Sequence, residues 1–225
     1  MASDSSGSDV IIAGSSLSDP ECRVFSALAI SEVERELLAS VLAEPWSVVV
    51  EFDDKTVPSG DWAAVRVPEN GLYLSLSTAT SYGLQLSGLL SGVLVARGVI
   101  SAERRSVIEL CLQEAVANAI IHGNLGIPST AKDHPEGYRV FSQLVNERLR
   151  DPLLRSRRIE LFARRVGLAL VISVLDQGSG FDQAGLPREV NGSKRSGRGF
   201  VFMRALANDV TVSDGGRCTS LRFDP

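Results

Sequence analysis

The chain has 225 residues, 44% of them hydrophobic and 22% charged, which is the composition of a folded globular protein and excludes disorder along its whole length. Its net charge of −4 is unevenly divided, because residues 1–100 carry 13 acidic and 5 basic side chains whereas residues 101–225 carry 14 and 18. An acidic chain of this kind is not expected to coat nucleic acid through many phosphate contacts, and we predict no direct nucleic-acid partner.

The three cysteines, Cys22, Cys111 and Cys218, are odd in number and far apart, which excludes a disulfide framework and a CxxC zinc site. They are typical of buried thiols in a reducing compartment. The first 20 residues contain no Lys or Arg and no long apolar run, so no secretory signal is predicted. No stretch reaches the roughly 18 uninterrupted apolar residues of a membrane span. The sequence therefore predicts a soluble, cytoplasmic protein without a membrane partner.

The first 60 residues are predicted to form a tail and an extension. Residues 1–18 are rich in Ser, Gly and Asp, and we expect a flexible tail with a short apolar strand at Val10–Ala13. In residues 19–60, two helices and a strand over 47–52 are predicted. The first helix follows Asp19-Pro20 and has Val24, Phe25 and Leu28 at helical spacing, and the second follows the capping box Ser31-x-x-Glu34 and contains Leu37, Leu38, Val41 and Leu42. We place a domain boundary near residue 60.

Residues 61–225 are predicted to form a mixed α/β domain with a helical insert at about residues 125–158. Apolar periodicity predicts helices over 83–97, 101–122 and 136–149, and strands over 63–67, 159–162, 166–175, 210–212 and 219–223. The last four strands are predicted to form two hairpins, with turns around Gly167 and around Asp214-Gly215-Gly216. In the first helix, Gly88 and Gly92 favour close packing on a neighbouring helix. The helix of the insert has one apolar stripe, formed by Tyr138, Phe141, Leu144, Val145 and Leu149. The arginines that follow it, Arg148, Arg150, Arg155, Arg157 and Arg158, form either a solvated face or an anion or partner site.

Three segments of this domain carry polar residues suited to chemistry. The first is ELCLQEAVANAIIHGN, residues 109–124, a mostly apolar helix in which Glu114, Asn118 and His122 share one face. This stripe is either a solvated edge or a polar site on a buried helix. In the second interpretation, the Glu114 carboxylate can accept a proton from a nucleophile and the Asn118 amide oxygen can bind Mg²⁺.

The second segment is VISVLDQGSGFD, residues 171–182, in which an apolar strand ends at Asp176 and leads into Gly178-Ser179-Gly180. The glycines permit positive φ angles and a close backbone approach to a flat ligand, and a carboxylate beside them suits the exocyclic amine of a purine. An ordinary hairpin or Asx-turn also explains this pattern. The dinucleotide fingerprint is excluded, because a third glycine is missing.

The third segment is NGSKRSGRGFVFMRALANDV, residues 191–210, a basic Gly/Ser-rich loop that runs into an apolar helix. Gly197 and Gly199 leave backbone N–H groups free at the start of this helix, which is a favourable place for an anion. Lys194 and Arg195 add positive charge there. A mobile surface loop is the alternative, with Phe200 as a core residue, and no Walker sequence occurs.

In this order, the three segments resemble the conserved boxes of the histidine-kinase-type (GHKL) ATPase superfamily. Their sequences are most similar to those of the anti-sigma-factor serine kinases. EAVANAIIHGN looks like the first box, DQGSGFD the second and SGRGFVFMRALANDV the third. The resemblance covers about residues 61–225. It implies a two-layer α/β (α+β) sandwich, in which a mixed, mainly antiparallel sheet has helices on one face and ATP lies between the helices and a loop.

The resemblance also implies a role for individual residues. Glu114 would be the catalytic base, and Asn118 would hold Mg²⁺. Asp176 would bind the adenine amine. The remaining residues of the implied ATP site are Gly178, Gly180, Lys194, Arg195, Gly197, Gly199, Phe200 and Thr219.

The function implied is that of an ATP- and Mg²⁺-dependent protein-serine kinase, which phosphorylates a serine of an antagonist protein and regulates transcription by partner switching. A sigma factor is the other partner implied, and the kinase relatives suggest a homodimer. One alternative is a nucleotide-gated binding protein that transfers nothing, and a third is a plain ATPase with a conformational output. A phosphoacceptor histidine helix is not found, which disfavours an autophosphorylating histidine kinase. The extension and the insert exceed what a compact family member needs, and we expect the insert near the nucleotide, as a partner platform or a shield.

Overall fold

The computed structural model describes residues 10–13, 27–30, 35–43, 48–51, 71–132, 137–181 and 198–225. Within these ranges, eight strands form one sheet in the order β1-β2-β3-β4-β5-β6-β8-β7. The pairings β2–β3 and β3–β4 are parallel and the other five are antiparallel. The strands are β1 (Val10–Ala13), β2 (Ala27–Ile30), β3 (Val48–Glu51), β4 (Leu72–Ser77), β5 (Arg158–Val166), β6 (Ala169–Asp176), β7 (Asp209–Ser213) and β8 (Cys218–Phe223).

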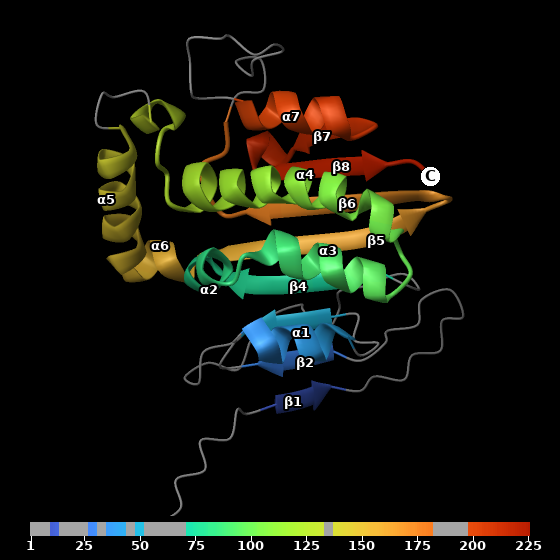
Figure 1. Cartoon of the computed structure of the whole chain (residues 1–225). Helices are drawn as coiled ribbons and strands as arrows, with labels where there is room; N and C mark the ends of the chain where they lie inside the picture. Colours follow the sequence, from blue (N-terminus) through green and yellow to red (C-terminus); the bar gives the residue numbers. More distant parts are fainter. Residues whose placement is uncertain are drawn as a thin grey trace, which may run out of the picture.

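Helices cover one face of this sheet, where α3, α4 and α7 lie side by side (Figure 1). The helical elements are α1 (Arg35–Ala43), α2 (Thr78–Gly83), α3 (Leu86–Ala96), η2 (Ala102–Arg104), α4 (Arg105–Ala117), η3 (Asn118–Asn124), η4 (Ser129–Lys132), α5 (Gly137–Arg150), α6 (Pro152–Ser156), α7 (Arg198–Leu206) and η6 (Asp214–Gly216). Alternate residues of β6, namely Leu170, Ile172 and Val174, are buried in the core between the layers. The predicted sandwich with a mixed, mainly antiparallel sheet is confirmed. Among the described residues, we find no helix with both the length and the apolar character needed to cross a membrane.

Helices α3 and α4 pack closely because α3 has glycines where they meet. A Cβ atom on Gly88 would lie 3.2 Å from Glu109 Oε1, and one on Gly92 would lie 3.7 Å from Arg105 Nη2. The predicted close packing is therefore confirmed. The predicted helix over 83–97 begins later, at Leu86, because Gln85 adopts a φ angle of 50° and separates α3 from α2.

The N-terminal extension joins the same sheet. Strands β1 and β3 are confirmed at or near their predicted positions, and α1 forms after the predicted capping box. The prediction that Leu28 continues a helix is wrong: residues 27–30 form β2, which pairs with β1 and β3, so strand pairing outweighs the spacing of a few apolar residues. Strand β4 was not predicted. Residues 1–9, 19–26 and 63–67, and the boundary near residue 60, lie outside the described residues.

The insert stands at one end of the sheet, where α5 packs against η4 and α6 (Figure 1). Val145 is buried, and Phe141, Leu144 and Leu149 pack against the core, as the amphipathic stripe predicts. Tyr138 was assigned to that stripe and is 70% exposed, because it lies in the first turn of α5. Helix α5 ends at Arg150, and Pro152 begins α6.

Candidate functional site

The first and third segments meet at the start of α7. Glu114 lies in α4, and Asn118 begins η3, a π-helical continuation of the same helix of the kind often found at functional sites. A Cβ atom on Gly199, the second residue of α7, would lie 2.5 Å from Glu114 Oε2 and 3.5 Å from Asn118 Nδ2. Glycine is therefore the residue that lets the start of α7 approach these two side chains so closely. His122, which shares their predicted face, has Nδ1 2.5 Å from the Ile127 carbonyl oxygen, beyond the end of η3.

The first and second segments meet where β6 ends. A Cβ atom on Gly123 would lie 2.5 Å from Asp176 Oδ1 and 2.6 Å from Oδ2, so the backbone of η3 rests on this carboxyl group. Gly178 lies against the carbonyl group of Gly123 in the same way. The side chain of Asn124 adds a hydrogen bond, because its Oδ1 accepts from the Gln177 N–H at 2.7 Å.

Asp176 is an acidic side chain buried on the helix-covered face of the sheet, with 7% of its surface exposed. Its Oδ1 accepts a hydrogen bond from the Gly178 N–H at 2.8 Å, whereas Oδ2 receives none from the described residues. Burial raises the pKa of this carboxyl group to about 6, and the Gly178 N–H, Arg217 and Arg157 oppose that rise. Thr219 lies on the same face, in β8, and is also buried. A buried carboxylate oxygen such as Asp176 Oδ2 is suited to accept one hydrogen bond from a donor such as an exocyclic amine.

The second and third segments are joined by an aromatic contact. The rings of Phe181 and Phe200 have centroids 5.6 Å apart in an edge-on arrangement. Gly180, with a φ angle of 72°, lies against the carbonyl oxygen of Gly215 in the turn between β7 and β8, which also accepts from the Phe181 N–H at 3.1 Å. The three segments, far apart in the sequence, therefore converge at one end of the molecule.

The sequence of the same region matches a known family. Residues 85–223 match the histidine kinase-like ATPase domain, and this range covers more than half of the chain. The chain belongs to the histidine kinase-like ATPase family. No curated protein matches the chain.

Membership of the histidine kinase-like ATPase family supports ATP as the ligand, and the residues present fit it. Glu114 and Asn118 lie directly against the start of α7, and Asp176 Oδ2 accepts no hydrogen bond from the described residues. No group of three or more His, Cys, Asp and Glu side chains that could hold a metal occurs within the described part of the chain. Of the residues that the sequence predicts for this site, Asn118 is the one that would hold a magnesium ion, together with the phosphates of the nucleotide.

Glu114 and Asn118 lie against Gly199, Asp176 and Gly178 lie against Gly123, and Thr219 is on the same face of the sheet as Asp176. The roles of these residues and of Gly180 in binding ATP stay predictions. Phe200 is buried in the core against Phe181, which agrees with its interpretation as a core residue, and its contact with nucleotide stays a prediction. Lys194, Arg195 and Gly197 lie outside the described residues.

Two residues at the end of the first helix were missed as part of the ATPase site. Gly123 and Asn124 contact Asp176 and Gln177, respectively. Gly123 could have been found, since a glycine within an otherwise apolar helix often marks a close backbone approach. Nothing in the sequence distinguishes Asn124 from a C-terminal helix cap, because its partners are 34 to 53 residues away.

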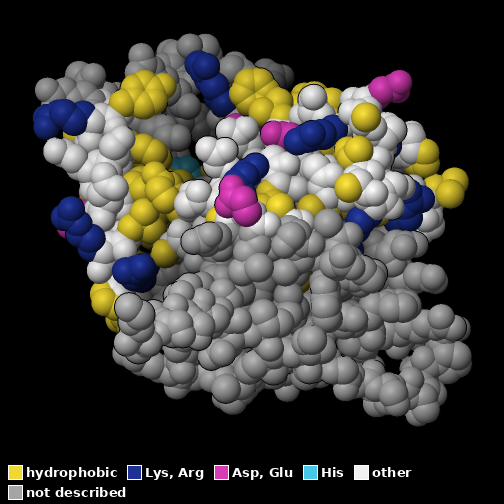
Figure 2. Space-filling view, turned by 60° about the horizontal axis from the view of Figure 1, so that its bottom comes forward, with side chains coloured by type: hydrophobic (Ala, Val, Ile, Leu, Met, Phe, Trp, Pro, Cys, Tyr) yellow, Lys and Arg dark blue, Asp and Glu magenta, His cyan; other side chains and the backbone are white. Residues whose placement is uncertain are grey.

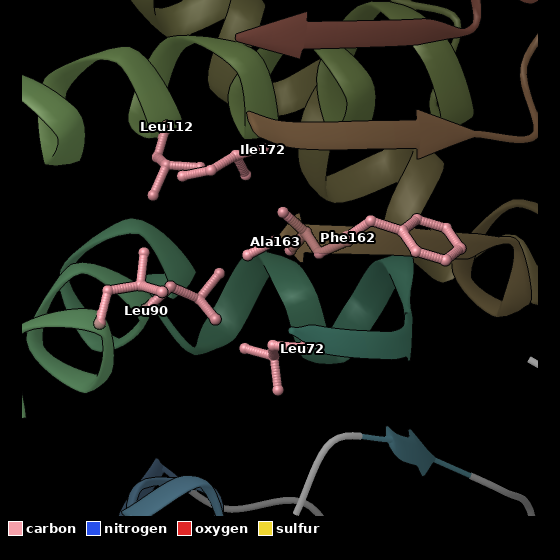
Figure 3. Close-up of a pocket in the computed structure, with 8 residues that line it drawn as sticks. Leu72, Leu90, Leu112, Phe162, Ala163 and Ile172 are labelled. Atoms are coloured by element: carbon pink, nitrogen blue, oxygen red, sulfur yellow. The ribbon is translucent and has the colours of Figure 1, made fainter. Parts of the chain in front are cut away.

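A small cavity in the core of the ATPase domain is separate from this site. It lies between α3, α4 and the sheet, and Leu72, Leu90, Leu112 and Ile172 are among its lining residues (Figure 3). None of the predicted site residues lines it. Its volume of about 10 Å³ is close to the minimum for one water molecule, and its lining is apolar, so it is a packing gap and not a ligand site.

The end of the insert contacts the end of η3, and a position of the insert near the nucleotide stays a prediction. Arg157, which follows α6, donates from Nη1 to the Asn124 carbonyl oxygen at 2.7 Å and helps to hold down the pKa of Asp176. Residues 137–157 contain five arginines and two carboxylates, so the insert is basic in an acidic chain. Figure 2 shows basic side chains along the left side of the molecule, the side on which α5 and α6 lie in Figure 1.

Proposed function

We propose that the protein is an ATP- and Mg²⁺-dependent protein-serine kinase of the anti-sigma-factor type, which phosphorylates an antagonist protein and thereby regulates transcription by partner switching. The observation that carries the proposal is the contact of Gly199 with Glu114 and Asn118. It unites, at the N-terminus of a helix, a carboxylate able to act as a base with an amide able to bind a metal ion.

In the proposed reaction, Glu114 takes the proton of the substrate serine hydroxyl. The serine oxygen forms a bond to the γ-phosphorus while the bond between that phosphorus and the β–γ bridging oxygen breaks, and ADP and phosphoserine result. When bound through Asn118, Mg²⁺ would offset the negative charge that develops on the phosphates. The first N–H groups of α7 point to the same region and contribute partial positive charge.

At the other end of the site, Asp176 is proposed to accept the exocyclic amine of adenine through Oδ2, while the Gly178 N–H holds Oδ1. The glycines at 178 and 180 let the turn after Asp176 pack directly on the backbone of Gly123 and Gly215, which holds the turn beside the carboxyl group. A base without that amine, such as guanine, presents an oxygen to the carboxylate instead and is rejected.

The kinase proposal is tested by incubating the chain with labelled ATP, Mg²⁺ and candidate antagonist proteins. Glu114→Gln keeps the size of the side chain and removes the base, so phosphoryl transfer should fall by about 10²–10⁴ while ATP affinity is retained. Glu103→Gln is the matched control, since Glu103 is an exposed glutamate near the start of the same helical region. Normal transfer by Glu114→Gln would exclude Glu114 as the base.

The alternative function is a nucleotide-gated binding protein without phosphoryl transfer. It is favoured by the basic insert, which carries the exposed side chains Leu153 and Arg155 and reaches the nucleotide region through Arg157. An antagonist or a sigma factor bound in an ATP-dependent manner, without transfer of label to any protein, would support it over the kinase. We also propose a homodimer that acts in the cytoplasm.

A further inference from the structure

We propose that Asn124 is a positioning residue that sets the preference for adenine, because it fixes the peptide that follows Asp176. This inference rests on the proposed binding of ATP and concerns one end of that site.

The side-chain amide of Asn124 is fully buried and has three partners on three different elements. Its Oδ1 accepts from the Gln177 N–H at 2.7 Å. Its Nδ2 donates to Thr78 Oγ1 at 2.8 Å and to the Arg158 carbonyl oxygen at 2.9 Å. The N–H of residue 177 needs an acceptor and the carbonyl of residue 158 needs a donor, so these partners fix the orientation of the amide.

The hydrogen bond between Asn124 and Gln177 takes the place of a backbone hydrogen bond of the sheet at the end of β6. The last backbone hydrogen bond here runs from the Asp176 N–H to the Arg217 carbonyl oxygen. The next N–H belongs to Gln177, and the Asn124 side chain accepts it. The strand is thus held on both sides of the Asp176 side chain, with Gly123 packed on the carboxyl group itself.

The anchor of Asn124 is itself rigid. Thr78 is buried and donates from Oγ1 to the Arg157 carbonyl oxygen at 2.8 Å. Arg157 closes the ring by donating to the Asn124 carbonyl oxygen at 2.7 Å. These bonds hold the Asn124 side chain in place and contribute to stability, whereas the position of Asp176 relative to a bound base depends on the bond between Asn124 Oδ1 and the Gln177 N–H.

Selectivity is sensitive to this position because the hydrogen bond to a base is directional. A displaced carboxylate loses the bond to the adenine amine, whereas the triphosphate, bound at the other end of the site, is unaffected. Loss of the Asn124–Gln177 bond should therefore lower the preference for ATP over GTP and leave the affinity for tripolyphosphate unchanged.

The experiment compares the wild-type chain with four variants, Asn124→Ser, Asn124→Asp, Asp176→Ala and Ser91→Ala, by calorimetry with ATP, GTP and tripolyphosphate in the presence of Mg²⁺, and records the thermal unfolding of each. Asn124→Ser removes the acceptor for Gln177 and keeps a small polar group in the buried site. Asn124→Asp keeps the acceptor and removes both donated bonds, so it should be less stable than wild type and yet selective. Ser91→Ala is the remote control, because Ser91 is a fully buried hydroxyl that bonds Glu109 Oε2 at 2.8 Å.

Asn124→Ser is expected to reduce the ratio of the GTP and ATP dissociation constants about tenfold, and Asn124→Asp and Ser91→Ala to leave it nearly unchanged. The inference is overturned if the preference for ATP over GTP decreases in proportion to thermal stability across the variants. It is also overturned if Asn124→Asp loses this preference. If Asn124→Ser does not fold, the result for Asn124→Asp decides. Wild type and Asp176→Ala distinguish a failure of the proposed ATP site from a failure of the role of Asn124. If wild type does not prefer ATP over GTP, the proposed site is wrong. If Asp176→Ala loses the preference for ATP and Asn124→Ser keeps it, only the role of Asn124 is wrong.

Discussion

The carboxyl group of Asp176 lies directly on the backbone of Gly123, where a Cβ atom would come within 2.5 Å of Oδ1. A strand end and a helix end that are far apart in the chain are thus packed together with only the Asp176 carboxyl group between them. Several measurable consequences follow from this contact and from the burial of the same carboxyl group.

Gly123→Ala should disturb the adenine end of the site. The added methyl group overlaps the carboxyl group of Asp176, which cannot move freely because Gly178 holds Oδ1. Overpacking of this kind costs about 1–3 kcal/mol of unfolding free energy, and ATP affinity should fall as well. Chemical denaturation and calorimetry measure the two effects.

Gly83→Ala is the matched control for that substitution, since a Cβ atom on Gly83 has no neighbour within 4 Å. A double variant, Gly123→Ala with Asp176→Gly, should regain part of the lost stability because the overlapping carboxyl group is gone. Strictly additive effects of the two substitutions would contradict the contact.

The affinity for adenosine should depend on pH through Asp176. Its pKa of about 6 means that the carboxyl group becomes protonated as the pH falls through that value, and a protonated carboxyl group is a poorer acceptor for the adenine amine. Adenosine binding should therefore be tight above pH 6 and weaken by up to about tenfold per pH unit below it. Adenosine is chosen over ATP because the terminal phosphate titrates near the same pH.

Asp176→Asn provides the control for this titration, as its amide does not ionise in that range. The adenosine affinity of this variant should be constant between pH 5 and pH 7, the interval in which the wild-type carboxyl group, with its pKa of about 6, changes its protonation. An equally steep pH dependence in the variant would assign the titration to another group.

The same burial makes Asp176 a cost to the stability of the nucleotide-free protein. Its folded-state pKa is raised from 3.8 to about 6, so the unfolded chain binds fewer protons between these values and stability falls as the pH rises through them. The loss at neutral pH is about 1–3 kcal/mol, because solvent screens part of the cost of the buried charge. Asp176→Asn should therefore be more stable than wild type at pH 7 and differ little below pH 4. Urea denaturation across this range measures the effect, and a variant no more stable at pH 7 would refute it.

Glu51 should be important for stability although it lies in the N-terminal extension. Its Oε1 accepts from Ser77 Oγ at 3.1 Å and from Thr80 Oγ1 at 2.6 Å, and its Oε2 accepts from the Ser77 N–H at 2.5 Å. These bonds join β3 to the start of α2. Glu51→Ala should lower the unfolding free energy by about 1–3 kcal/mol.

Glu36→Ala is the control for Glu51→Ala, because Glu36 is an exposed glutamate of α1. A negligible effect of Glu51→Ala would mean that the extension folds apart from the ATPase domain. A large effect would show that β3 is an integral part of its sheet.

The amino-acid sequence determined those features that depend on neighbouring residues. The β5–β6 hairpin turns at Gly167, whose φ angle is 62°, and the β7–β8 turn contains Gly215 at 63°, both where the sequence predicts turns. Turn chemistry and apolar periodicity act over a few residues, which is why these elements could be predicted. The three polar segments were identified for the same reason, since each is contiguous.

Only the tertiary structure decided how distant residues meet. Residues 27–30 became a strand because β1 and β3 offer backbone partners, and no local pattern encodes those partners. The Asn124 side chain accepts from the Gln177 N–H, which lies 53 residues away and directly after the end of β6. Such contacts depend on strand register and helix packing, which arise from the balance of burial and hydrogen bonding over the whole chain.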